Sequence, residues 1–170
     1  VGLIGNPSHG LQALPVLEVD YSSLAADLPK ILGYESKWLP DSPYWKDIRY
    51  KEANLDEQRR ATMIDNAIRL FERLGCRDYA RFDFREDRNG EIKLLEVNPN
   101  PGWCWDGKFN LMAGFDGMSY AEMLAAILDA AIARYQLAEP STTLHKKTAP
   151  QRMGKFRKQT KAEAKAEAKA

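Results

Sequence analysis

The sequence has few cysteines and no long apolar run. Cys76 and Cys104 are its only cysteines, too few for a disulfide framework. No CxxC pair or cluster of Cys and His occurs, which argues against a structural zinc site. No apolar run is long enough to span a bilayer, and no basic-then-apolar leader opens the chain. These absences predict a cytoplasmic protein with no membrane segment.

The overall composition is typical of a globular protein, with 44% hydrophobic and 29% charged residues. The net charge of +1 conceals an asymmetry, because residues 145–170 hold nine of the 25 basic residues and two of the 24 acidic ones. Apolar periodicity is lost from residue 139 onward. We therefore expect a domain over 1–138 and a basic, low-complexity tail over 139–170, disordered or marginally helical. No interleaved aromatic residues support nucleic-acid binding by this tail.

Apolar strand patterns lie near the start of the chain. Val1 to Gly5 predicts a buried strand, and Val16 to Val19 predicts a second one. A buried strand at residue 1 needs neighbours, so we expect the sequence to begin inside a larger domain. Residues 20–53 are rich in Pro, Tyr, Trp and Lys and predict a long, irregular, mobile loop region, which is typical of active sites.

Two helices are predicted by apolar stripes with capping residues at their ends. Asn54 and Glu57 resemble a capping pair at the start of the first helix, and Gly75 suits its C-terminal cap. Ser119 and Glu122 form a capping box at the start of the second helix. Both stripes repeat with helical spacing, so each helix has one face for a core.

Two strands, 79–85 and 91–98, lie between the helices and flank Asn89-Gly90, the strongest short hairpin signal. Strands paired in this way are antiparallel. The sequence therefore predicts an α+β fold, an antiparallel sheet with helices packed on one face, which is incomplete at the N-terminus.

A two-residue turn at Asn89-Gly90 sets the register of the hairpin. The expected pairs are Arg81–Asn98, Phe82–Val97, Asp83–Glu96, Phe84–Leu95 and Arg88–Glu91. One face is then apolar, and the other carries Arg81, Asp83, Glu96 and Asn98. A three-residue loop would place Phe82 opposite Glu96, which speaks against it. A four-residue loop keeps the faces but moves Asp83 opposite Leu94.

The polar face of the hairpin brings two carboxylates directly opposite each other, which is destabilising unless something compensates. Arg81 and solvent could offset the charge, and a divalent cation would offset both carboxylates. Oxygen atoms of Asp83, Glu96 and Asn98 suit Mg²⁺ or Mn²⁺ with substrate phosphates. The alternative is an exposed sheet face with a screened cluster of ion pairs.

A rigid turn, Pro99-Asn100-Pro101-Gly102, follows the second strand. Its exposed backbone N–H groups could hold an oxyanion or phosphate, although an ordinary Pro/Gly loop has the same sequence pattern. Asp106 and Lys108 come after this turn and could face a substrate.

The stretch GCRDYARFDFREDRNGEIKLLEVNPNPGW resembles the last catalytic segment of D-alanine–D-alanine ligases, in the ATP-grasp superfamily. The specific part is R-x-D followed by L-E-V-N-x-x-P-G, and GMSYAEML is similar to the closing helix of these proteins. The similarity covers roughly residues 1–136. It implies an ATP-grasp C-terminal domain and a two-step reaction, in which ATP phosphorylates a carboxylate and an amine then attacks the acyl phosphate.

The resemblance also implies roles for the hairpin residues. Asp83, Glu96 and Asn98 correspond to the Mg²⁺ ligands, with Glu96 bridging two ions. Arg81 corresponds to the arginine that stabilises charge on the transferred phosphoryl group. The backbone at Gly102 corresponds to an oxyanion-binding amide.

Other positions match less closely. Lys37 corresponds to the lysine of a mobile loop that closes over the phosphates, and Trp38 follows it where the family usually has Tyr. Family members commonly hold the second substrate's carboxylate with a serine shortly after P-G. This sequence has Asp106 and Lys108 in that region and no serine, so Lys108 could bind the carboxylate as a point charge.

The resemblance implies that a substrate domain, a glycine-rich lid and the adenine-binding hinge precede residue 1. ATP and small amino-acid-like substrates are then the expected partners, and nucleic acid is not. An alternative is a non-catalytic remnant that keeps only metal or nucleotide binding. A homodimer stays open, because the sequence does not give the oligomeric state.

Overall fold

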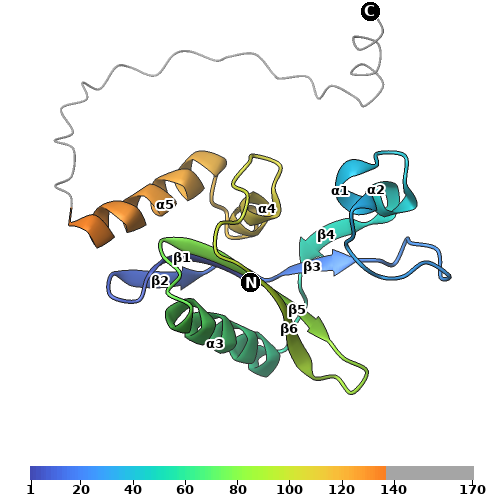
Figure 1. The fold of residues 1–170 in the computed structure, drawn as a ribbon, viewed down its shortest axis with the longest axis horizontal. Helices are drawn as coiled ribbons and strands as arrows, with labels where there is room; N and C mark the ends of the chain where they lie inside the picture. The colour runs from blue at the N-terminus through green and yellow to red at the C-terminus, as the bar shows by residue number, and fades with distance from the viewer. Residues whose placement is uncertain (137–170) are drawn as a thin grey trace, which may run out of the picture. The chain divides into compact units, whose positions relative to one another are not determined.

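The computed structural model describes residues 1–136, so the predicted tail, 139–170, lies outside the described residues. Strands and helices alternate irregularly along the chain (Figure 1). Their bounds are β1 (Gly2–Asn6), β2 (Gly10–Ala13), β3 (Leu17–Asp20), α1 (Glu35–Trp38), α2 (Pro43–Asp47), β4 (Arg49–Glu52), α3 (Glu57–Arg73), β5 (Tyr79–Glu86), β6 (Ile92–Asn98), α4 (Lys108–Phe115) and α5 (Tyr120–Tyr135).

The main sheet has four antiparallel strands in the order β2-β1-β5-β6, and β3 and β4 form a separate antiparallel ribbon. The predicted α+β class with an antiparallel sheet is confirmed. Strand β1 forms where the sequence predicts it, and all five of its residues are buried. Because it is an interior strand, β1 joins the hairpin β5–β6 to β2.

Helices cover both faces of the main sheet, whereas the sequence predicted cover on one face. Leu3 belongs to the core under α3 with Phe71, and its neighbour Ile4 belongs to the core under α4 and α5 with Phe109. Figure 1 shows α3 on one side of the sheet and α4 and α5 on the other. The reason is that successive β1 residues point to opposite faces and both faces are apolar, so each needs its own cover.

Two of the capping predictions hold and one is wrong. Ser119 and Glu122 form the expected capping box of α5. Gly75 follows the end of α3 with a φ of 64° and donates to a carbonyl of the last turn. The first helix, however, is capped by Asp56, whose side chain accepts from the backbone N–H of Arg59 at 2.8 Å. The better acceptor therefore lies two residues after the predicted Asn54.

Residues 20–53 contain regular structure, so the prediction of an irregular segment is wrong in part. Helices α1 and α2 are short, and the Ser42 hydroxyl caps α2 by accepting from the Trp45 backbone N–H at 3.2 Å. Strand β4 pairs with β3, with Tyr50 opposite Val19. Elements of four or five residues carry too few apolar positions to show a period. Mobility of this segment stays a prediction.

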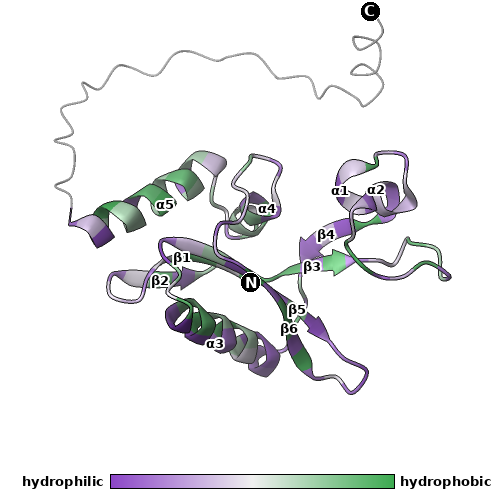
Figure 2. Cartoon of the chain, viewed as in Figure 1, coloured by the Kyte–Doolittle hydropathy of each residue, from purple (hydrophilic) through white to green (hydrophobic). Residues whose placement is uncertain are grey.

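Among residues 1–136 no single helix is long and apolar enough to cross a membrane. Helices α4 and α5 together have the length and apolar composition of a membrane span, but the chain bends by 101° between them. In Figure 2 α5 is largely green, and its buried residues Met123 and Ile127 belong to the core against β1. Its apolar character therefore has a structural explanation in the fold.

A buried polar cluster ties α5 to the sheet, and the sequence patterns did not predict it. Asp78 accepts from both Nε (2.8 Å) and Nη2 (2.6 Å) of Arg134, and from Nδ2 of Asn6 at 3.0 Å. The same Asn6 amide nitrogen donates to the Ala130 carbonyl at 3.1 Å. Asp78 has a φ of 67°, a left-handed conformation that Asp adopts more readily than most residues. Residues far apart in sequence thus meet at one carboxylate.

Replacing Asp78 with Ala should destabilise the fold by about 3 kcal/mol or more, because the charge of Arg134 and the Asn6 amide lose their partner. The free energy of unfolding from urea titration measures the effect. Asp65, an exposed carboxylate on α3, supplies the matched control, and Asp65→Ala should change it by less than about 0.5 kcal/mol. Equal effects of the two substitutions would contradict the assignment.

The same pair should make the fold sensitive to acid. Hydrogen bonding from Arg134, and then from Asn6, outweighs burial and lowers the pKa of Asp78. A carboxyl whose pKa is lower in the folded state stabilises the fold above its unfolded pKa, and the effect is lost as pH falls through the folded value. Stability should thus decline more steeply below about pH 4 in the parent than in Asp78→Asn. Parallel pH profiles of the two proteins would refute this origin.

Candidate functional site

The hairpin brings the predicted polar residues onto one face of the sheet. Asp83 is paired with Glu96, and Arg81 with Asn98, as the sequence predicts. Register partners point to the same face of a sheet, and so do residues two apart along a strand. The four side chains therefore share the face opposite Phe82, which is fully buried under α3.

The turn that produces this register differs from the predicted one. The backbone N–H of Asp87 donates to the Glu91 carbonyl at 2.8 Å, and Gly90 has a φ of 81°. The loop between them has three residues rather than two, so the predicted pair Arg88–Glu91 is wrong. The Asp87 side chain accepts from the backbone N–H groups of Asn89 (2.8 Å) and Glu91 (3.0 Å), which stabilises the longer loop.

A β-bulge restores the predicted pairing closer to the site. Phe84 pairs with Leu94, and the register shifts between Asp83 and Phe84, which leaves Leu95 as the extra residue. The predicted pair Phe84–Leu95 is therefore wrong, and Leu95 is 62% exposed rather than part of the core. The extra residue in the turn shifts the strand register by one, and the extra residue in the bulge shifts it back, so Asp83 still pairs with Glu96.

Arg81 and Asp83 form a two-armed ion pair on this face. Arg81 Nε and Nη2 lie 2.8 and 2.9 Å from the two carboxylate oxygens of Asp83. The Arg81 side chain is only 17% exposed, so the pair is shielded more than a surface ion pair. The pair holds the guanidinium in one orientation, and it also occupies the carboxylate that the sequence predicts as a metal ligand.

A cavity of about 750 Å³ is lined in part by this face, and its walls include residues of β3, β5, β6, α1, α3 and α4. Its lining includes five of the predicted site residues: Lys37, Arg81, Asp83, Glu96 and Lys108. The other predicted residues are Asn98, Gly102, Asp106 and Trp38, and they do not line it. Asn98 is nevertheless the register partner of Arg81. Trp38 is 66% exposed, and Gly102 and Asp106 lie in the exposed loop before α4.

Lys108 has a perturbed electrostatic environment in the cavity. Burial, and then the charges of Arg81 and Lys37, lower the pKa of Lys108, while Asp83 and Glu96 act in the opposite direction. Its Nζ lies 5.1 Å from the centre of the Tyr50 ring. Burial is also the main cause that raises the pKa of Tyr50. The lysine therefore lies in a partly desolvated, positively charged part of the cavity.

Tyr50 does not line the cavity, but it contacts Lys108, and sequence reasoning missed this contact. It lies in the polar sequence Arg49-Tyr50-Lys51-Glu52, which has no apolar alternation to indicate a strand. A lone aromatic residue between charged neighbours was the only signal. The pairing of β4 with β3 brings Tyr50 to Lys108, and no local pattern predicts that contact.

The loop from Pro99 to Gly107 has a defined conformation that positions Lys108. The Gly107 N–H donates to the Cys104 carbonyl at 3.0 Å, and a Cβ at Gly107 would lie 3.0 Å from Cys104 Sγ. The Asn110 amide donates to the Trp105 carbonyl at 2.6 Å. Gly107 is thus the glycine that this loop requires, whereas a Cβ at Gly102 would meet nothing within 4 Å.

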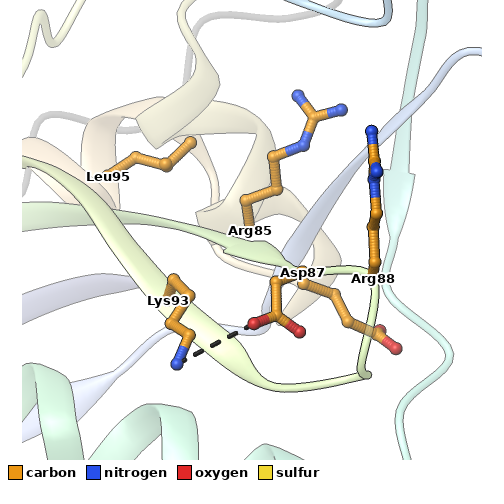
Figure 3. Close-up of a pocket in the computed structure, with 6 residues that line it drawn as sticks. Arg85, Asp87, Arg88, Lys93 and Leu95 are labelled. Atoms are coloured by element: carbon orange, nitrogen blue, oxygen red, sulfur yellow. Dashed lines mark ion pairs between the residues drawn. The ribbon is translucent and has the colours of Figure 1, made fainter.

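A second hollow of about 470 Å³ lies at the hairpin tip and contains none of the predicted site residues. Figure 3 shows Lys93 and Asp87 pointing toward each other, and their charged atoms lie 3.8 Å apart. Lys93 also pairs with Glu91, and Arg59 pairs with Glu86. The charges here largely satisfy one another at an exposed surface, so the larger cavity is the better candidate site.

The donor set of the polar face fits a hard cation with few protein ligands. Two carboxylates and one amide oxygen, from Asp83, Glu96 and Asn98, suit Mg²⁺, which commonly takes one or two carboxylates plus phosphates. Within residues 1–136 no group of three or more His, Cys, Asp or Glu side chains is arranged to hold a metal ion. A cation here would therefore draw its remaining ligands from water and substrate.

Comparison with known proteins identifies the family. The sequence profile described as "D-ala D-ala ligase C-terminus" matches residues 1–129. An uncharacterised protein, y4sG, of Sinorhizobium fredii is 35% identical over 136 residues, which cover 79% of this chain and 38% of that protein. The D-alanine–D-alanine ligase of Treponema denticola is 33% identical over 108 residues, covering 63% of this chain and 28% of the ligase.

Solved structures give the same fold. D-alanyl-alanine synthetase A from Vibrio cholerae superposes with a TM-score of 0.54 at 24% identity, over 77% of this chain and 37% of that one. The D-alanine–D-alanine ligase of Bacillus anthracis gives a TM-score of 0.55 at 18% identity, over 72% and 36%. The chain thus spans less than two fifths of the length of these relatives. On the profile match and these relatives, it belongs to the D-alanine–D-alanine ligase C-terminal domain family.

Proposed function

We propose that this chain is the C-terminal catalytic portion of an ATP-dependent carboxylate–amine ligase that acts through an acyl phosphate. The observation that carries the proposal is the shared face of Arg81, Asp83, Glu96 and Asn98 beneath the 750 Å³ cavity. Its substrates would be ATP, a carboxylate and a small amino-acid-like amine. We infer a cytoplasmic location, in keeping with two free cysteines, Cys76 and Cys104.

The acidic and amide side chains of the site would bind a cation, and the basic side chain would stabilise negative charge. Asp83, Glu96 and Asn98 would hold Mg²⁺ (or Mn²⁺), which supplies neutralisation of the phosphate charge when bound. Arg81, held in one orientation by Asp83, would stabilise negative charge on the transferred phosphoryl group. Such a site accelerates reaction mainly by positioning and electrostatic stabilisation.

The remaining predicted residues would bind at the edges of the cavity. Lys37 would contact phosphates from the 20–53 segment, with Trp38 beside it at the exposed surface. The Gly102 backbone N–H would meet an oxyanion, as the resemblance to the family implies. Lys108 would bind a substrate anion. A substrate-binding role for Asp106 has the least structural support, because Asp106 does not line the cavity.

A second candidate is a non-catalytic remnant that binds metal or nucleotide without turnover. The observation that favours it is the two-armed Arg81–Asp83 pair, because a carboxylate with both oxygens engaged must share them to bind a cation. The two candidates differ in turnover, since either could bind a cation at Asp83 and Glu96. Absence of cation binding would leave Arg81 and Asp83 as a purely structural ion pair.

Replacing both carboxylates, as Asp83→Asn with Glu96→Gln, should weaken Mn²⁺ binding about tenfold or more, because the charged ligands are lost while side-chain size is kept. Titration calorimetry or the Mn²⁺ EPR signal measures the affinity. The double variant Asp87→Asn with Glu91→Gln removes two carboxylates at the hairpin tip and should leave the affinity unchanged. Equal affinity in all three proteins would rule the proposed metal site out.

The 170-residue chain alone should release phosphate from ATP negligibly in the presence of Mg²⁺ and D-alanine. The reason is that it spans 28–38% of the relatives named above, and the rest of their length would supply the other parts of the cleft. A coupled phosphate-release assay, with a full-length D-alanine–D-alanine ligase as positive control, measures the rate. Robust turnover by the chain alone would contradict this expectation.

A further inference from the structure

The segment between Leu24 and Ile48 is held in place by very little packing. Leu24 and Ile48 are buried, but none of residues 25–47 is buried. Helices α1 and α2 belong to this segment, and in Figure 1 they lie side by side away from the main sheet. Tyr34 and Trp38 are 68% and 66% exposed, so these large side chains do not anchor the segment in a core. Residues 25–47 are called the strap below.

The hydrogen bonds of the strap are local, with one exception. The Leu28 N–H, for example, donates to the Ala25 carbonyl at 3.1 Å. Among the described residues, a single hydrogen bond connects the strap to a distant part of the chain. In it, Arg85 Nη1 donates to the Lys30 carbonyl at 2.7 Å, across 55 residues of sequence. The strap is therefore fixed at its two buried ends and at this one point between them.

The guanidinium of Arg85 is available for this bond because its acidic neighbours have other partners. Glu86 pairs with Arg59, and Asp87 pairs with Lys93. Figure 3 shows the Arg85 side chain extending away from Lys93 and Asp87. Arg85 is exposed, so its side chain has no role in the hydrophobic core. Its hydrogen bond to the strap is the structural contact that distinguishes it.

The position of the strap decides the shape of the cavity. Lys30, Ile31 and Leu32 line the cavity, and so does Lys37, a few residues further along the strap. A segment that is fixed only at its ends has many conformations, and a contact midway along it removes a large share of them. Few buried contacts also mean that such a segment opens locally at low free-energy cost. The bond from Arg85 thus bears directly on where this wall lies.

We propose that Arg85 is the residue that holds the strap against the cavity, and that breaking its bond to Lys30 lets the strap move away. Arg85 lies on the same strand as Arg81 and Asp83 and, two residues further along, on the same face. It is a positioning residue, which acts on Lys37 through the strap. That Lys37 contacts phosphate rests on the proposed function, whereas the role of Arg85 in holding the strap does not.

Backbone amide hydrogen exchange of the 170-residue chain, followed by NMR, tests the proposal. Arg85→Met should raise the exchange rates of strap amides, such as those of Leu28 and Lys37, about tenfold, because a charge-assisted hydrogen bond that opposes local opening is lost. Arg85→Lys keeps the charge and a donor, so it should recover protection to within about threefold of the parent. Amides of α3 should exchange as in the parent, because the core is unchanged.

Two controls keep the outcome specific. Arg88→Met removes an exposed arginine from the hairpin tip and should leave the exchange of the strap amides unchanged. The Asp83→Asn, Glu96→Gln variant should lose Mn²⁺ affinity and keep the protection of the strap. Failure of this proposal and failure of the proposed function are thereby distinguished.

Unchanged exchange of the strap amides in Arg85→Met would overturn the proposal. A rise spread evenly over the strap, the main sheet and α3 would also overturn it, because it would report a loss of overall stability. Exchange as fast in Arg85→Lys as in Arg85→Met would overturn the hydrogen bond as the cause of protection.

Discussion

The candidate site depends on a difference between the two faces of β5. One face is buried in the hydrophobic core, and the other carries charged side chains. Ala80 and Phe82 are fully buried under α3, which holds the strand in the sheet. Arg81 and Asp83 alternate with them and therefore point to the other face. Helix α4 covers that other face near Tyr79, whose ring meets Phe109 edge-on at 5.9 Å. Beyond that contact the face is left to the cavity, and the charged side chains lie there.

The pairing of β5 with β6 was predictable near the site and not at the turn. Alternation of apolar and polar residues limits the hairpin to registers that keep the two faces, and the predicted pair of Asp83 with Glu96 is the one observed. Alternation does not constrain the hairpin tip. There, a three-residue loop and a bulge at Leu95 give the same Asp83–Glu96 pair as the predicted two-residue turn. The face pattern is set by burial, whereas the turn is set by local hydrogen bonds to the Asp87 side chain.

Contacts between distant segments account for most of what the sequence did not predict. The capping box of α5 is local and was predicted, and β4 and α4 are short elements that packing stabilises. Asp78 carries no local signal for its pair with Arg134, which is 56 residues away. Tyr50 meets Lys108 only because β3 and β4 pair. Sequence patterns describe periodicity within an element and do not specify which elements meet.

Membership of the ligase C-terminal domain family and the geometry of the polar face give a consistent picture with one departure. Arg81, Asp83, Glu96 and Asn98 lie on one face of the hairpin, as the pairing register predicts. After Gly102, Gly107 fits a tight loop, and Lys108 follows it and lines the cavity. The resemblance implies a serine in this region, which this sequence lacks, and a point charge at Lys108 is suited to an anion.

The central claim is that the polar face of β5 and β6 binds a divalent cation. Residue-resolved line broadening of backbone amide NMR signals by substoichiometric Mn²⁺ locates such a site directly, since the paramagnetic effect falls steeply with distance. The account predicts that the signals of Asp83, Glu96 and Asn98 broaden first, while those of α3 and of the hairpin tip persist. Broadening that starts at Glu86, Asp87 and Glu91 would place the cation in the acidic cluster of the tip and contradict the claim.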